Sequence, residues 1–100
     1  MNYQIIITPE AEKDLDEAFK RYEKNSPGLG VEFLNCVDES LKVIQDTPEI
    51  YQNVYKNIRR ALTHRFPYGI FYIIEEDVII VLAVFHAKRN PKIWKKRHPK

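Results

Sequence analysis

The sequence is poor in the residues that mark secreted, membrane-spanning or metal-binding proteins. It has one cysteine, Cys36, in 100 residues, so no disulfide can form within the chain. Its longest apolar runs, residues 70–74 and 78–85, are far shorter than the roughly 20 residues that a membrane-spanning helix needs. No basic start followed by an apolar stretch marks a signal peptide. We therefore expect a cytoplasmic protein that does not associate with membranes.

Signatures of cofactor binding are also missing. The histidines, His64, His86 and His98, are dispersed, and no second cysteine completes a metal-ligand pattern. Gly28 and Gly30 fall between two predicted helices, so they do not form a phosphate-binding loop after a strand. We expect neither a metal nor a cofactor. The side chains left for chemistry are Arg, Lys, His and Tyr, which bind phosphates and move protons without a metal.

Charge is distributed unevenly along the chain. Residues 1–50 hold five Lys/Arg and eleven Asp/Glu, whereas residues 51–100 hold eleven Lys/Arg and three Asp/Glu. This division predicts one acidic and one basic face on the folded protein. A basic face suits a nucleic acid or an acidic protein partner.

Hydrophobic periodicity predicts one α+β domain that spans residues 1–100. Apolar residues recur at helical spacing in two segments of the first half, and strand-like runs follow in the second half. The expected elements are a strand at 3–7, a helix at 9–24, a second helix that ends before Pro48, a half-apolar strand at 58–65, strong strands at 68–74 and 78–85, and a short helix after Asn90.

This order, β-α-α-β-β-β followed by a short C-terminal helix, predicts a helical hairpin packed on one face of an antiparallel sheet. The last three strands form a meander, which the N-terminal strand joins. We expect the other face of the sheet to be open and basic. Trp94 is expected to anchor the short helix, and residues 95–100 are expected to fray.

His86 is the main candidate for proton transfer. It lies at the end of the strongest strand and is followed by Lys88 and Arg89, whose charges favour a neutral imidazole that acts as a base. The alternative is a structural or partner-contacting histidine. Tyr68 and Trp94 fit a core or the lining of a groove as well as they fit a binding surface.

Two motifs carry a resemblance to a known family. Residues 66–72 read FPYGIFY, and residues 84–91 read VFHAKRNP. With the order of the elements and the acidic first helix, they resemble the RelE/ParE superfamily of toxins from type II toxin–antitoxin modules. The resemblance spans nearly the whole chain, and it implies a growth-arresting toxin that a cognate antitoxin neutralises.

The resemblance also bears on the target. The RelE-like branch cuts mRNA on the ribosome, whereas the ParE-like branch poisons DNA gyrase. Gly69 occupies a place where mRNA-cleaving members typically have an arginine, and Trp94 stands near a position where some carry a catalytic tyrosine. The spacing of His86 and Arg89 is more similar to the ParE-like branch. A non-enzymatic gyrase inhibitor is therefore favoured, with a metal-independent mRNA endoribonuclease as the alternative and an inactive or repurposed nucleic-acid-binding module as a third hypothesis.

Each hypothesis assigns roles to the same basic region. If the chain is a nuclease, the resemblance implies that the phosphate is held and protons are transferred by Arg60, His86, Lys88 and Arg89. For contact with gyrase or with the ribosome and its mRNA, the candidate residues are Arg59, Arg60, Arg65, Tyr68, His86, Arg89 and Trp94.

Overall fold

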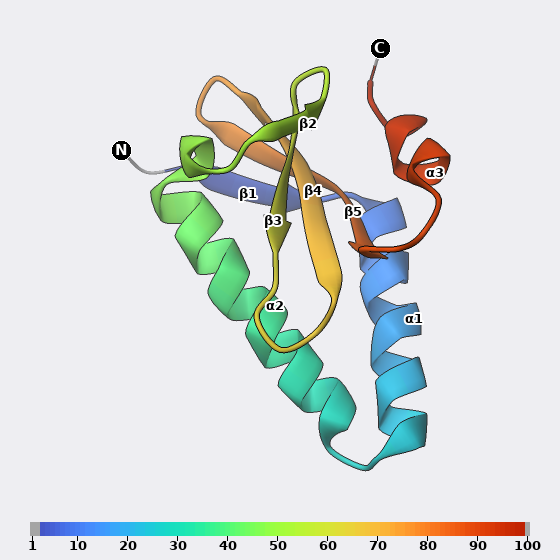
Figure 1. Ribbon diagram of the computed structural model, residues 1–100. Coiled ribbons are helices and arrows are strands. Elements are labelled where there is room, and N and C mark those ends of the chain that lie inside the picture. The colour runs from blue at the N-terminus through green and yellow to red at the C-terminus, as the bar shows by residue number, and fades with distance from the viewer. Residues whose placement is uncertain (1–2, 100) are drawn as a thin grey trace.

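A five-stranded sheet carries two long helices on one face and a short helix on the other (Figure 1). The computed structural model describes residues 3–99. Its elements are β1 (Gln4–Ile7), α1 (Pro9–Asn25), α2 (Leu29–Asp46), the 3-10 turn η1 (Pro48–Ile50), β2 (Asn53–Tyr55), β3 (Ile58–Leu62), β4 (Tyr68–Glu75), β5 (Val78–His86) and α3 (Pro91–Lys95). The predicted α+β class and order of elements are confirmed. Within residues 3–99, no helix is long and apolar enough to cross a membrane.

The strands lie in the order β1-β5-β4-β3-β2. The meander is antiparallel, but β1 runs parallel to β5, so the sheet is mixed. Two features were not predicted from the sequence, η1 and the edge strand β2. Their segment is short, and its polar and apolar residues follow neither helical nor strand periodicity. The predicted strand at 58–65 ends at Leu62, because Thr63 turns to bond with Phe66 and Tyr68.

The helical hairpin closes on a turn that requires glycine. Gly28 has φ +88°, a conformation that other residues adopt at a cost, and Gly30 lies where α2 meets α1. A Cβ on Gly30 would lie 2.8 Å from the backbone oxygen of Phe19. The Glu23 carboxylate accepts hydrogen bonds from both glycine N–H groups, at 2.9 and 3.0 Å. The turn therefore holds the two helices close enough to cover the sheet together.

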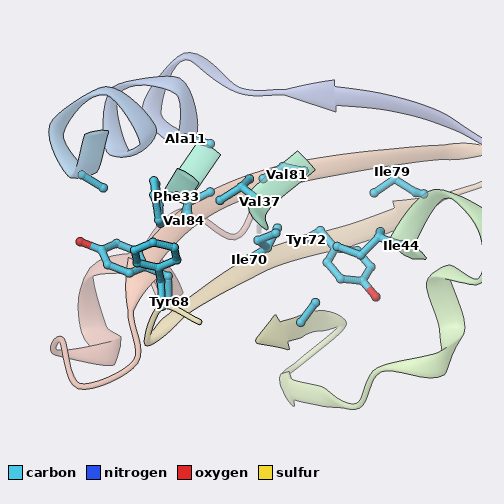
Figure 2. Close-up of a cluster of buried hydrophobic side chains, with 13 residues drawn as sticks. Ala11, Phe33, Val37, Ile44, Tyr68, Ile70, Tyr72, Ile79, Val81 and Val84 are labelled. Carbon is cyan, nitrogen blue, oxygen red and sulfur yellow. The ribbon is translucent and has the colours of Figure 1, made fainter. Parts of the chain in front are cut away.

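The main core lies between this hairpin and the inner face of the sheet (Figure 2). Alternate residues of β4 and β5 point toward the helices, as the period of a strand requires. The side chains of this core include Ala11, Phe33, Val37, Ile44, Tyr68, Ile70, Tyr72, Ile79, Val81 and Val84. Burial of these residues fixes the ends of β4 and β5, from which the candidate site is built.

The outer face of the sheet is not open, contrary to the sequence-based expectation. Trp94 of α3 stacks on Phe71 with ring centroids 4.3 Å apart, over a second buried cluster that includes Leu82 and Phe85. The expectation that residues 95–100 fray is also wrong for the described part, because Lys95 belongs to α3 and Arg97 is ion-paired with Asp14. Lys100 lies outside the described residues. The basic surface is thus confined to what α3 leaves uncovered.

Candidate functional site

The candidate site lies at the end of the sheet where β4 begins and β5 ends. Tyr68 and His86 are register partners there, and the Ala87 N–H donates to the Pro67 carbonyl at 2.7 Å. These contacts bring the β3–β4 loop (residues 63–67) beside the β5–α3 loop (residues 87–90). Cations that are about 25 residues apart in the sequence therefore gather at one end of the molecule.

The outer side of this end carries two arginines, Arg60 and Arg89, that form no ion pair within residues 3–99. Gly69 lies opposite Phe85, and a Cβ on Gly69 would be 3.1 Å from the Cδ of Arg60, so the arginine stem packs over the glycine. The Arg89 guanidinium carbon lies 4.5 Å from the centroid of the Phe85 ring. Among residues 3–99, neither arginine has a carboxylate partner. Together with exposed Lys88 in the adjoining loop, Arg60 and Arg89 form what we call the basic rim.

His86 faces the inner side of the sheet. Its ring contacts Tyr68 edge-on, with centroids 5.6 Å apart, and its Nδ1 accepts a hydrogen bond from the Lys88 N–H at 3.1 Å. The neutral ring therefore carries its hydrogen on Nε2. The Tyr68 hydroxyl accepts from Arg21 at 3.0 Å. Since the lone pair that a general base needs is already used at Nδ1, His86 is arranged as a hydrogen-bond donor.

The other two predicted arginines hold loops in place. Arg65 forms an ion pair with Glu32 of α2. Arg59 donates to the backbone carbonyls of Glu49 and Tyr51, which fixes the segment that leads into β2. Neither guanidinium is as available to a partner as those of Arg60 and Arg89.

The two faces of the sheet divide the predicted target-binding residues. Arg60, Arg89 and Trp94 lie on the outer side, whereas Tyr68 and His86 lie on the inner side. Tyr68 and Trp94 are 4% and 6% exposed, so both contribute to the cores. The basic rim is what remains for direct contact with a large partner.

Arg59 also lies near a buried tyrosine. The Tyr72 hydroxyl donates to the Pro48 carbonyl at 2.6 Å, and burial raises the pKa of this phenol to about 12, although the charge of Arg59 opposes the rise. An unfolded tyrosine has a pKa near 10. The raised value makes the neutral phenol a source of native-state stability.

We expect the stability contribution of Tyr72 to be complete below pH 10 and to be lost as the pH rises to about 12. Between these values the unfolded phenol ionises while the folded one keeps its proton. Urea unfolding of the parent, Tyr72→Phe and the control Tyr3→Phe across this range measures the effect. The free energy of unfolding should fall less steeply with pH in Tyr72→Phe than in the other two proteins. Equal slopes in all three proteins would contradict the assignment.

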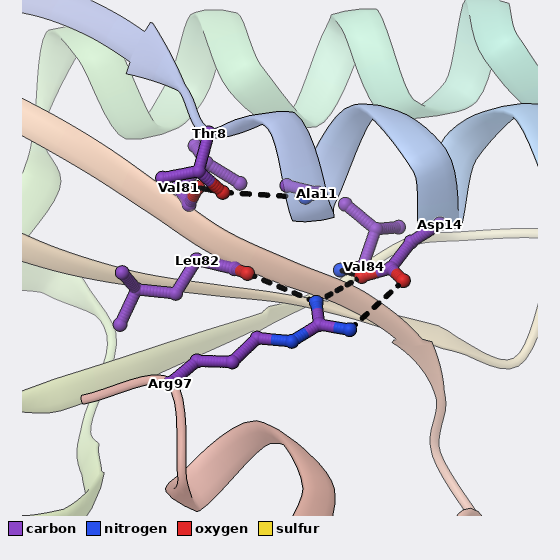
Figure 3. A network of polar contacts seen from close by, with 7 residues as sticks. All are labelled: Thr8, Ala11, Asp14, Val81, Leu82, Val84 and Arg97. Carbon is purple, nitrogen blue, oxygen red and sulfur yellow. Dashed lines mark hydrogen bonds and ion pairs between the residues drawn. The ribbon is translucent and has the colours of Figure 1, made fainter.

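A largely buried ion pair near the site was missed by the sequence analysis (Figure 3). Asp14 of α1 accepts hydrogen bonds from the Val84 N–H at 3.0 Å and from both terminal nitrogens of Arg97, at 2.6 and 3.2 Å. Arg97 also donates to the Leu82 carbonyl at 3.1 Å. β1 ends at Ile7, opposite Val81 of β5. Beyond that point, the Asp14 and Arg97 side chains bond to backbone groups of β5 that a neighbouring strand would otherwise bond.

One sequence signal pointed to Asp14. It lies three residues after Ala11 and four before Ala18, on the buried stripe of α1, where a carboxylate needs a partner. No local pattern identifies Arg97 as that partner, since 83 positions separate the two residues. Arg97 also lies 4.8 Å from the Phe85 ring, beside the basic rim.

Known proteins are similar to this chain over most of its length. A family model described as the ParE toxin of the type II toxin–antitoxin system, parDE, matches residues 5–91. The toxin ParE2 of Mycobacterium tuberculosis is 32% identical over 92 residues, which cover 91% of this chain and 88% of the relative.

Solved structures share the fold at lower identity. The chromosomal ParDE system of P. aeruginosa gives a TM-score of 0.76 at 17% identity and covers 84% of this chain and 95% of its own. The RelBE2 toxin–antitoxin complex of M. tuberculosis gives 0.60 at 16% identity, covering 86% and 99%. A free mutant of E. coli RelE gives 0.60 at 14% identity, covering 97% and 94%.

Proposed function

Because the chain belongs to the ParE toxin family and is a toxin of a type II toxin–antitoxin system, we propose that it arrests growth by binding and inhibiting DNA gyrase. It acts in the cytoplasm, and an antitoxin encoded beside it neutralises it. Two structural neighbours come from toxin–antitoxin systems, which supports the antitoxin partner. On this proposal the toxin works by occupying its target and breaks no bond.

The observation that carries the choice of a binding mechanism is the hydrogen bond from the Lys88 N–H to His86 Nδ1. Metal-independent RNA cleavage needs a base that removes a proton from the attacking hydroxyl. The histidine nearest the basic rim has its lone pair occupied, and the Tyr68 hydroxyl already accepts from Arg21. The polar groups at this end of the sheet support its architecture and are poorly placed for proton transfer.

The two departures from the nuclease pattern support the same choice. Gly69 is buried under the Arg60 stem, and the Trp94 ring is stacked on Phe71 within the outer cluster. Neither position presents a hydroxyl or a guanidinium at the surface. The charge and proton chemistry that an arginine and a tyrosine would supply are therefore missing at both places.

A second candidate function rests on the basic rim itself. Arg60 and Arg89 have no carboxylate partner in the described chain, so their guanidinium groups are available for phosphate oxygens as well as for acidic side chains. This arrangement favours a ribosome-dependent endoribonuclease. In that case His86 acts through Nε2–H as a donor to the leaving group.

The two functions are separated by assaying the purified toxin on both targets. We expect inhibition of gyrase supercoiling with accumulation of cleaved DNA, while mRNA on programmed ribosomes stays intact. The purified Leu82→Ala protein, whose core is disrupted, serves as the control for non-specific inhibition. Codon-positioned mRNA cuts with unaffected gyrase would reject the binding mechanism and make the chain an enzyme.

A further inference from the structure

The turn at the end of β5 (residues 86–89) carries two cations of the basic rim, and His86 closes it twice. The Arg89 N–H donates to the His86 carbonyl at 3.0 Å, so the chain reverses within four residues. The His86 Nδ1 accepts from the Lys88 N–H at 3.1 Å, as an asparagine side chain bonds to the backbone two residues on. His86 therefore bonds to both charged residues of the turn.

Each backbone N–H that follows His86 in this turn has an acceptor. The Ala87 N–H donates to the Pro67 carbonyl at 2.7 Å, and the next two donate to the His86 side chain and the His86 carbonyl. Of these three acceptors, the imidazole nitrogen is the one that belongs to a side chain. It is therefore the one that a substitution or a change of pH can remove.

The turn determines where the Arg89 side chain begins. Its guanidinium carbon lies 4.5 Å from the centroid of the Phe85 ring, which is buried in the outer cluster. A cation held over a ring has few conformations left to lose, so ordering it on a partner costs less free energy. A loosened turn would keep the charge of Arg89 but lose this order.

The groups around His86 would leave a positive charge on its ring uncompensated. The ring lies against Tyr68, whose hydroxyl accepts from Arg21 of α1. The turn adds the charges of Lys88 and Arg89, and His86 forms no ion pair within residues 3–99. An imidazolium carries hydrogen on both nitrogens, so it cannot accept from the Lys88 N–H. Protonation would therefore break the side-chain bond of the turn.

We propose that His86 is the positioning residue of the basic rim. Its neutral imidazole accepts from the Lys88 N–H and thereby holds Arg89 in the orientation that binds the target. This inference rests on the proposed function, in which the rim binds gyrase. The role requires an acceptor at Nδ1, whereas donation to a target or a leaving group would require the hydrogen on Nε2.

Two amide substitutions separate these two roles. The Asn oxygen can take the place of Nδ1 as acceptor, whereas the Gln side chain reaches the place of Nε2 and can donate there. We expect His86→Asn to arrest growth and bind gyrase within about twofold of the parent. His86→Gln and His86→Ala should each weaken gyrase binding by about threefold to tenfold, as expected for the loss of one hydrogen bond. Thermal melts of the purified variants check that each is folded.

The outcomes of this comparison are distinct. Stronger arrest by His86→Gln than by His86→Asn would overturn the inference and indicate donation from Nε2. Equal arrest by all three folded variants, at the level of the parent or below it, would also overturn it. If the parent does not bind gyrase but arrest is still retained in His86→Asn and weakened in His86→Gln, the proposed target is rejected and the positioning role stands.

The pH dependence of gyrase binding is a second test. Histidine side chains gain their second hydrogen between about pH 8 and pH 5. Over this range, binding by the parent should fall about threefold or more relative to His86→Asn, because only the parent loses its acceptor. The control His64→Asn, at an exposed histidine of the β3–β4 loop, should follow the parent. Equal pH dependence of the parent and His86→Asn, or tighter binding by the parent at low pH, would contradict the proposal.

NMR of the toxin alone tests the hydrogen bond itself. Long-range proton–nitrogen spectra of the imidazole should show hydrogen on Nε2 and none on Nδ1 of His86 at about pH 8. This readout does not depend on any target. Hydrogen on Nδ1 would overturn the inference and leave the proposed function intact.

Discussion

Replacing Asp14 with alanine is expected to lower the free energy of unfolding by about 2 to 4 kcal/mol, because it removes one partner of a largely buried ion pair. The side chains of Asp14 and Arg97 are 6% and 22% exposed. In the variant, water can therefore solvate the Arg97 guanidinium only in part. The substitution also leaves the Val84 N–H without its acceptor. Urea unfolding followed by circular dichroism measures the change.

Asp16→Ala is the matched control for this experiment. Asp16 lies on the same helix and forms an ion pair with Lys20 at 3.0 Å, but both side chains are more than half exposed. Its removal should change stability by no more than about 0.5 kcal/mol. If the free energy of unfolding of Asp14→Ala lies within about 1 kcal/mol of that of the parent, then the Asp14–Arg97 pair does not hold the edge of β5 as described.

The second large effect concerns growth arrest. Arg60→Ala and Arg89→Ala should each weaken arrest while shifting stability by no more than about 0.5 kcal/mol, since neither guanidinium is ion-paired in the described chain. Leu82→Ala should also abolish arrest, but through a core loss of roughly 2 to 5 kcal/mol, because Leu82 is 5% exposed. Growth curves after induction, combined with thermal melts of the purified proteins, distinguish these two causes.

The decisive comparison is between the arginine variants and Lys13→Ala, a change to an exposed lysine of α1 outside the basic rim. Arrest by Lys13→Ala should match that of the parent. If both arginine variants melt like the parent and still arrest growth fully, the basic rim is not the working surface. The helical hairpin would then become the better candidate for target contact.

The fold was largely predictable because its elements carry strong periodicity. The apolar stripe of α1, from Ala11 to Ala18, and the long runs of β4 and β5 predicted the elements within one or two residues. β2 was missed because a three-residue edge strand is stabilised by pairing with β3, which no local pattern encodes. The covered outer face was missed for a similar reason, since the stacking of Trp94 on Phe71 joins distant segments.

The candidate site was predictable in composition but not in arrangement. The sequence indicated that Arg60, His86 and Arg89 meet near one end of the sheet, and register and loop contacts place them there. Strand alternation then puts His86 and Arg60 on opposite faces. The tautomer of His86 also depends on the hydrogen bond from the Lys88 N–H, which forms only when the β5–α3 loop folds.

Direct binding of the purified toxin to purified gyrase tests the central claim, which is that growth arrest comes from binding through the basic rim. The titration should be performed at fixed, moderate salt, because exposed charges are screened within about 10 Å at 0.1 M. We predict a saturable complex with the parent protein and roughly tenfold weaker binding by Arg89→Ala. An arrest-competent toxin that forms no complex with gyrase would contradict the claim.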